Sequence, residues 1–212
     1  MRIVMDPGDE NMIATYNDPL AERGGVVFDA GFERFFSGRY GNKKYMENVA
    51  VWLEENSSSA NSRNILIYNT FSGSGIDNEL FNRNALSALQ EEGSFKIKIT
   101  DRKETPEISG KLLEEYGQLW LFFGETGPGC CFSDSEVGTI SRFNESGGSM
   151  LIVTGHQAGE EHDQTAVNRL SFSFGVSFSG SVENEEELNV SSSVYFFSRV
   201  SEIFGRLYGS MT

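Results

Sequence analysis

The residue types best able to do chemistry gather in one polar stretch, 155–163, which reads GHQAGEEHD. It holds both histidines of the chain and three acidic residues, namely His156, Glu160, Glu161, His162 and Asp163. Histidines and carboxylates are common zinc ligands, and a histidine can also act as the base of a hydrolase. No HExxH or comparable spacing is present. A solvated acidic loop with Asp163 capping a helix is the competing interpretation, so we expect no metal site.

Two further stretches contain groups that could react or hold an anion. Cys130 and Cys131, the only cysteines, lie in a loop with Gly and Pro, where we expect a buried, inert role rather than a reactive thiol. Two adjacent cysteines are too few for a disulfide framework, which favours a reducing, cytoplasmic location. Thr70–Gly75, TFSGSG, is either a loop whose backbone amides hold an anion or a plain Gly–Ser turn.

Each of these polar stretches follows a short apolar run. Asn64–Asn69 precedes TFSGSG, the very apolar Leu119–Phe123 precedes the cysteines, and Met150–Val153 precedes the histidines. Segments with helical spacing come after the polar stretches. Alternating strands and helices are typical of a parallel sheet with helices on both faces, and such sheets bind ligands at the carboxyl ends of their strands. We therefore predict an α/β protein with a parallel sheet of about five strands.

Composition divides the rest of the chain. We predict a polar N-terminal arm over 1–23 with little structure of its own, a single α/β domain over 24–190 and an amphipathic helix over 191–212. Within the domain, 24–55 supplies a strand and a helix, and the small polar stretch 56–63 is a linker. The terminal helix either docks on its own domain or contacts a partner chain, which would form an oligomer.

Charge and hydropathy exclude some functions. The net charge of −14 argues against a nucleic-acid partner, because affinity for a phosphate backbone comes mainly from Lys and Arg. No apolar run approaches the roughly 20 residues that a membrane-spanning helix needs. The N-terminal residues also lack the apolar core of a signal peptide. These features are typical of a soluble globular protein.

From Asn64 to Phe178 the chain resembles the class I glutamine-amidotransferase-like superfamily, which has a flavodoxin-like fold. The segments that carry the resemblance are NILIYN (64–69), CFSDSEVGTISRFNESGGSMLIVTG (131–155) and NRLSFSFGVSF (168–178). ThuA-like proteins and the amidotransferase-like domain of intraflagellar-transport proteins share this pattern. Such domains usually finish with one more strand and helix, and the matching residues stand here at the front, from Gly25 to Leu53.

The position of this first segment has two explanations. Either the domain is circularly permuted, or the chain begins with the tail of a preceding copy. We expect permutation, because the main run lacks its final strand and 24–55 supplies one. The resemblance then implies a permuted flavodoxin-like three-layer sandwich, in which Gly25–Phe28 pairs beside Met150–Val153.

The resemblance does not extend to catalytic residues. Amidotransferases need a cysteine nucleophile on a sharp turn between a strand and a helix. Gly155-His156-Gln157 is similar to the residues after that nucleophile, but the preceding dipeptide, Val153-Thr154, contains no cysteine. TFSGSG is similar to the phosphate loop of flavodoxins, although Phe71 is bulky for such a loop. The sequence therefore puts glutaminase activity in doubt and leaves FMN binding as an alternative.

We expect a catalytically silent amidotransferase-like domain that binds a protein partner or a small polar ligand, for example a carbohydrate as in ThuA-like relatives. We expect no cofactor. The alternatives are a hydrolase that uses the His156–His162 loop and an FMN-binding electron carrier. Carboxylates at the strand ends disfavour a phosphate and favour a neutral polyol or sugar. The expected ligand-binding residues are Asp29, Asn69, Thr70, Ser72, Glu125, Thr126, His156 and Glu160.

Overall fold

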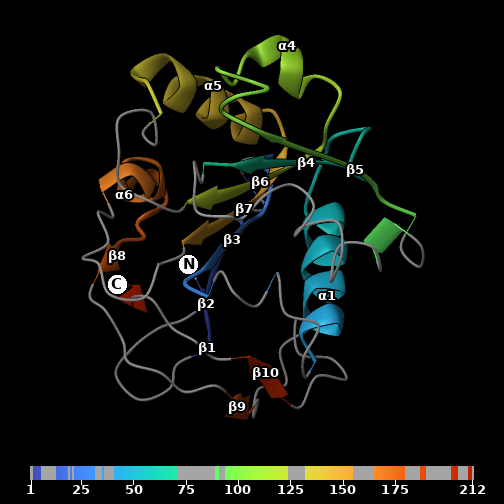
Figure 1. The fold of residues 1–212 in the computed structure, drawn as a ribbon, viewed down its shortest axis with the longest axis vertical. Coiled ribbons are helices and arrows are strands. Elements are labelled where there is room, and N and C mark those ends of the chain that lie inside the picture. The colour runs from blue at the N-terminus through green and yellow to red at the C-terminus, as the bar shows by residue number, and fades with distance from the viewer. Residues whose placement is uncertain are drawn as a thin grey trace.

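A seven-stranded sheet with strand order β1-β2-β3-β7-β6-β4-β5 organises the computed structural model (Figure 1). The residues that the structure describes are 2–5, 13–18, 20, 22–31, 35, 41–70, 89–90, 94–123, 132–154, 165–179, 187–189, 202–204 and 210–211. The strands of this sheet are β1 (Arg2–Met5), β2 (Ile13–Tyr16), β3 (Val26–Asp29), β4 (Asn64–Asn69), β5 (Lys96–Asp101), β6 (Gln118–Phe123) and β7 (Ser149–Thr154). The described helices are α1 (Asn42–Glu55), α4 (Gly110–Leu113), α5 (Asp134–Glu145), α6 (Thr165–Ser171) and the 3-10 turn η2 (Phe172–Phe174). None of them is long and apolar enough to cross a membrane.

The predicted α/β class with a mostly parallel sheet is confirmed, although the sheet has seven strands where about five were predicted. The five strands β3, β7, β6, β4 and β5 are parallel to their neighbours. Counted from β4, with β3 as the fifth strand, they lie in the flavodoxin-like order 2-1-3-4-5. The predicted pairing of the first segment is confirmed, because Val26 lies opposite Met150 and Asp29 opposite Val153.

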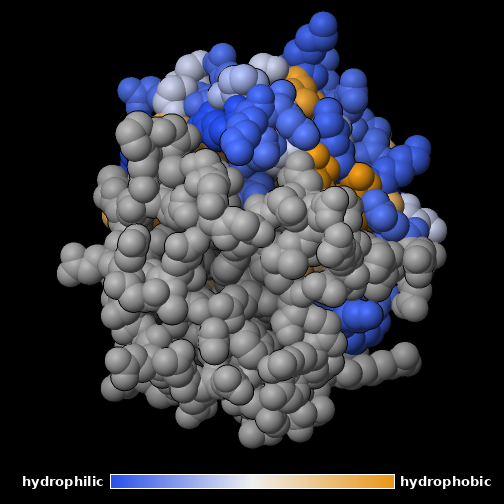
Figure 2. Space-filling view, in the orientation of Figure 1, coloured by the Kyte–Doolittle hydropathy of each residue, from blue (hydrophilic) through white to orange (hydrophobic). Residues whose placement is uncertain are grey.

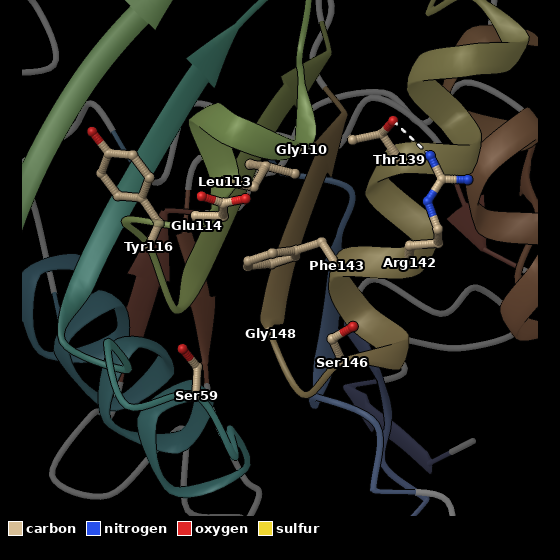
Figure 3. A pocket seen from close by; sticks show the side chains of 10 residues that line it. All are labelled: Ser59, Gly110, Leu113, Glu114, Tyr116, Thr139, Arg142, Phe143, Ser146 and Gly148. Carbon is tan, nitrogen blue, oxygen red and sulfur yellow. Dashed lines mark hydrogen bonds between the residues drawn. The ribbon is translucent and has the colours of Figure 1, made fainter.

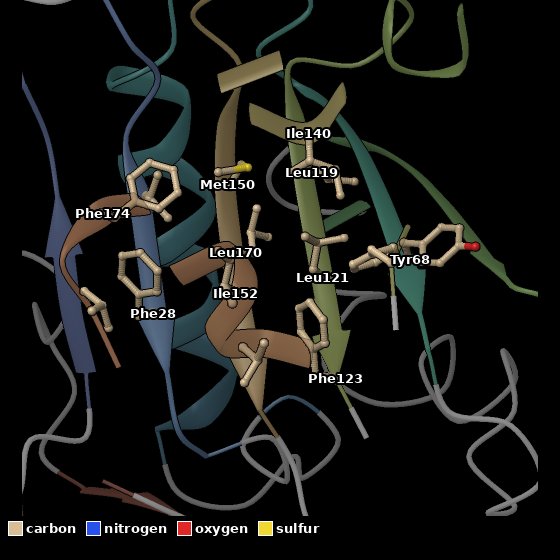
Figure 4. Packing of buried hydrophobic residues seen from close by; sticks show 14 of the residues in the cluster. Phe28, Tyr68, Leu119, Leu121, Phe123, Ile140, Met150, Ile152, Leu170 and Phe174 are labelled. Atoms are coloured by element: carbon tan, nitrogen blue, oxygen red, sulfur yellow. The ribbon is translucent and has the colours of Figure 1, made fainter. Parts of the chain in front are cut away.

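Helices cover both faces of this sheet and complete the three layers (Figure 1). On one face α1 buries Tyr45, Val49 and Leu53 against alternate residues of the central strands, such as Trp120. The opposite face packs against α4, α5 and α6, and Figure 4 shows its core. Its labelled side chains are Phe28, Tyr68, Leu119, Leu121, Phe123, Ile140, Met150, Ile152, Leu170 and Phe174. Burial on both faces explains why β6 and β7 read as continuous apolar runs.

Local rules explain where α5 begins. Ser133 Oγ accepts a hydrogen bond from the Glu136 backbone N–H at 3.2 Å, and the Glu136 carboxylate accepts one from Ser133 N–H at 2.9 Å. This reciprocal capping box satisfies two backbone donors that a helix start leaves without partners.

The last strand of the sheet, β5, exposes Lys96 and Lys98, as expected for an edge strand.

The N-terminal arm prediction is wrong, because residues 1–23 contain β1 and β2. β2 runs antiparallel to β3, with Ile13 opposite Asp29, and buries Ile13 completely. Without it, β3 would present a row of unpaired backbone groups at the sheet edge. These two strands are short and flanked by polar residues, so the sequence pattern did not predict them.

The C-terminal helix prediction is also wrong for the residues described there. Glu202–Phe204 form β10, which pairs with β9 (Glu187–Asn189), and Ser210–Met211 form β11, which pairs with β8 (Phe178–Ser179). Apolar spacing in such short stretches does not distinguish a helix from a strand, and pairing with strands distant in the sequence determines which one forms. The remainder of 191–212, and with it any contact to a partner chain, lies outside the described residues.

The stretch 56–63 connects α1 to β4 but does not behave as a free linker. Ser57 Oγ donates to the Gly147 carbonyl oxygen at 2.8 Å, and Ser58 N–H donates to the same oxygen at 3.1 Å. The Gln118 side-chain amide donates to Ser62 O at 2.8 Å. These bonds fasten the stretch across the amino ends of β6 and β7.

Candidate functional site

The strand order reverses between β4 and β6, and open parallel sheets bind ligands at that point. Asn69 ends β4 there, and Thr70 follows it. The backbone N–H and Oγ1 of Thr70 both donate to the Phe122 carbonyl oxygen at 3.0 Å. Asn69 and Thr70 are each only 2% exposed, so their placement is set by the sheet. The structure thus brings together two of the predicted site residues.

An acidic residue that was not predicted lies next to them on β5. Asp101 is opposite Asn69 in the parallel register. Its Oδ1 accepts hydrogen bonds from the backbone N–H groups of Lys103 at 2.8 Å and Glu104 at 2.9 Å. The carboxylate therefore shapes the turn after β5 and adds negative charge beside the end of β4. Aspartate directly after an apolar-polar alternation is a turn pattern that could have pointed to it.

Asp29, the third predicted site residue that the structure describes, lies elsewhere on this edge. It ends β3 and is fully buried. Oδ1 accepts a hydrogen bond from Gly31 N–H at 2.7 Å, and Oδ2 accepts one from the Tyr45 hydroxyl at 2.8 Å. Three strand spacings separate β3 from β4, which is about 14 Å. Asp29 therefore ties β3 to α1 and does not share a contact site with Asn69.

The other predicted site residues lie outside the described part of the chain. They are Ser72, Glu125, Thr126, His156 and Glu160. The same holds for Cys130, Cys131 and the His156–His162 loop. Among the residues that are described, no group of three or more His, Cys, Asp or Glu could hold a metal ion.

A buried ion pair at the carboxyl edge was missed by sequence reasoning. The Arg102 guanidinium, directly after β5, donates through both Nη atoms to the Glu136 carboxylate, with 3.3 Å between Nη2 and Oε2. It lies over two rings, 5.5 Å from the Tyr68 centroid and 4.8 Å from the Phe132 centroid. Ile108 N–H also donates to Glu136 at 3.1 Å. The capping box revealed Glu136, but nothing local in the sequence links it to Arg102.

This environment changes the protonation of its members. Burial raises the pKa of Tyr68 to about 12, although the neighbouring Arg102 partly opposes the effect. Burial alone would also raise the pKa of Glu136, but the hydrogen bonds from Arg102 and from the backbone of Ser133 and Ile108 hold it below its ordinary value. The phenol therefore stays neutral and the carboxylate stays charged near neutral pH. The Arg102 charge is already matched within the protein.

The end of β7 is where an amidotransferase-like nucleophile would be expected, because Gly155-His156-Gln157 follows this strand in the sequence. Val153 and Thr154, the residues that precede GHQ, are both fully buried and continue the strand. They pair with Phe122 and Phe123 of β6 in regular register. The described residues before GHQ therefore provide an extended apolar strand and no thiol.

Comparison of the chain with protein-family models, curated proteins and solved structures gives no match in any of the three.

Proposed function

We propose that this protein is a catalytically silent, circularly permuted amidotransferase-like domain that binds a small, neutral, hydroxyl-rich ligand at the carboxyl edge of its sheet. The observation that carries the proposal is the 2-1-3-4-5 order of the parallel strands, with Asn69 and Thr70 at the point where the order reverses. The placement of β3 beside β7 supports the permutation, because the fifth of the parallel strands precedes the other four in the chain.

Charge favours a neutral ligand over a phosphate. Asp101 lies beside the reversal point, and Arg102 is engaged by Glu136. The net charge of the chain is −14, which opposes the approach of an anion. The residues that end β4 and follow it, Asn69 and Thr70, carry no charge, and an uncharged polar strand end suits a sugar or polyol better than an anion.

The buried Val153-Thr154 dipeptide supports the absence of glutaminase chemistry. The rival functions, a hydrolase using His156–His162 and an FMN protein using 71–75, depend on residues outside the described part of the chain. No observation favours either of them. A protein partner at the same edge is the other outcome that the experiment below distinguishes.

The test is a backbone-amide NMR titration of the protein with D-glucose, myo-inositol and FMN. We expect either polyol to shift the amide resonances of Asn69, Thr70 and Asp101, and FMN to leave them unchanged. Asn69→Ala should weaken polyol binding, while Asn61→Ala, in the loop at the opposite edge, should not. Strong FMN binding would refute the proposal. Failure of both polyols, together with capture of a protein that Asn69→Ala abolishes, would replace the ligand by a partner.

A further inference from the structure

A cavity of about 330 Å³ lies between α4 and α5, near the amino ends of the strands and so away from the carboxyl ends discussed above (Figure 3). Leu113 and Glu114 line it from the α4 side, Arg142 and Phe143 from α5, and Gly148 at the amino end of β7. Its volume lies within the range of about 300–1,000 Å³ typical of small-molecule sites. The described surface over α4 and α5 is mostly hydrophilic (Figure 2). The cavity is separate from the site proposed above.

The apolar wall of the cavity is preformed by a close contact. A Cβ atom at Gly148 would lie 2.3 Å from Phe143 Cζ, so the ring rests directly on the glycine backbone. Gly147 before it has φ +91°, a conformation that favours glycine. Leu113 on the facing side is only 3% exposed. The Phe143 ring is therefore held in place as a fixed apolar surface.

Arg142, on the α5 side, has no acidic partner among the residues that the structure describes. Four other arginines with described side chains, Arg23, Arg63, Arg102 and Arg169, each pair with a carboxylate. Among these described side chains, Arg142 alone makes no ion pair, and its hydrogen bond goes to Thr139 Oγ1 at 3.1 Å. The chain carries 31 acidic and 17 basic residues, so an arginine without an acid is the less expected arrangement.

The carboxylate of Glu114 supplies the charge opposite to that of Arg142. Glu114 and Arg142 are on opposite sides of Phe143 in Figure 3. Glu114 is exposed and, within the described part of the chain, forms no ion pair. The cavity thus presents a carboxylate, an apolar surface and a guanidinium in sequence.

We infer that this cavity binds a small zwitterion whose ammonium and carboxylate stand at opposite ends of an apolar body, of the ω-amino-acid class. The ligand carboxylate would pair with Arg142, whose planar N–H groups suit a carboxylate, and its ammonium with Glu114. The apolar body would cover Phe143 and Leu113. A singly charged molecule leaves one of the two cavity charges unmatched.

Three probes built on one benzene ring test this charge pattern: the zwitterion 4-(aminomethyl)phenylacetate, the anion 4-methylphenylacetate and the cation 4-methylbenzylamine. Each is titrated into the isotope-labelled protein while the amide resonances of Leu113, Phe143 and Gly148 are followed. We expect 4-(aminomethyl)phenylacetate to bind at least fivefold more tightly than the two singly charged probes. This factor corresponds to about 1 kcal/mol, the upper end for one exposed ion pair.

Variants assign each charge to its residue. Arg142→Gln should weaken binding of 4-(aminomethyl)phenylacetate about fivefold and leave 4-methylbenzylamine unchanged. Glu114→Gln should weaken binding of 4-(aminomethyl)phenylacetate and leave 4-methylphenylacetate unchanged. Arg169→Gln, an exposed arginine of α6 that does not line the cavity, is the matched control and should change nothing. Circular dichroism checks that each variant is folded. Equal affinity for the three probes, no shift at these three amides, or equal loss in Arg169→Gln would each overturn the inference.

Discussion

Glu136 takes part in the buried ion pair, and replacing it by glutamine tests that pair. Its carboxylate accepts hydrogen bonds from Arg102, from Ile108 N–H at 3.1 Å, and from Ser133 N–H at 2.9 Å. Glutamine keeps the shape but loses the charge, and its amide NH₂ must face at least one of these donors. The Arg102 charge would then remain between two rings without its counter-charge.

The cost follows from how buried the pair is. The side chains of Arg102 and Glu136 are 18% and 5% exposed. Removing one partner of a buried pair costs about 3–5 kcal/mol, and the residual exposure of Arg102 places the value near 3 kcal/mol. For a chain of this size, we expect the melting temperature to fall by about 6–12 °C.

Urea unfolding followed by tryptophan fluorescence measures this loss for Glu136→Gln. Asp134→Asn is the matched control, because Asp134 is also in the first turn of α5 but pairs with Arg169 while 96% exposed. We expect it to cost less than about 1 kcal/mol. If the two substitutions cost the same, the Arg102–Glu136 pair contributes no more than a surface pair and our reasoning is refuted.

Acid provides a second check on the same variant. Because the pKa of Glu136 is lowered in the folded protein, its stabilising contribution is present above the ordinary value of 4.5 and is lost as the pH falls through the lowered value. The stability gap between the wild type and Glu136→Gln should therefore shrink as the pH is lowered below 4.5. A gap that stays constant in acid would show that the charge is not what stabilises the pair.

Three further predictions concern Tyr68, Gly148 and the N-terminal strands. The pKa of Tyr68 is raised from 10.0 to about 12 in the folded protein, so the stability that the neutral phenol contributes is complete below pH 10 and is lost as the pH rises through 12. In urea unfolding experiments, Tyr68→Phe should therefore lose less stability than the wild type as the pH rises through this range. An equal loss in both proteins would contradict the assignment. Gly148→Ala places a Cβ 2.3 Å from the Phe143 ring and should cost about 1–3 kcal/mol of unfolding free energy, partly recovered by adding Phe143→Leu; a neutral Gly148→Ala would argue against the close contact. Deleting residues 1–23 should expose the edge of β3 and cause self-association in sedimentation experiments, whereas a monomeric deletion variant would mean that β2 is not needed to protect that edge.

Local pattern was sufficient for the middle of the chain. Continuous apolar runs predicted β4, β6 and β7, which lie inside the sheet with neighbours on both sides. The Ser133–Glu136 spacing is the sequence pattern of the capping box that starts α5, and the α/β class followed from the alternation of strands and helices. These features depend on neighbours a few residues apart, which is the range over which backbone preference and periodicity act. Asn69 and Thr70 could be placed at the strand ends for the same reason.

Other features depended on pairing across the chain. The strands β2, β10 and β11 pair with segments that lie further away in the sequence, and β1 pairs with β2 in turn. The composition of these stretches predicted an arm and a helix instead. The separation of Asp29 from Asn69 follows from strand order, which the order of residues along the chain does not reveal.

The sequence by itself determined the α/β class, the buried strands and the start of α5, because each is written in residues that are close together along the chain. Only the tertiary structure decided which polar groups meet. Arg102 and Glu136 are 34 positions apart, and Ser57 and Gly147 are 90 apart. The cavity between α4 and α5 likewise depends on Phe143 resting on Gly148 across from Leu113. Such contacts follow from packing of the whole sheet, which brings together residues that no local pattern connects.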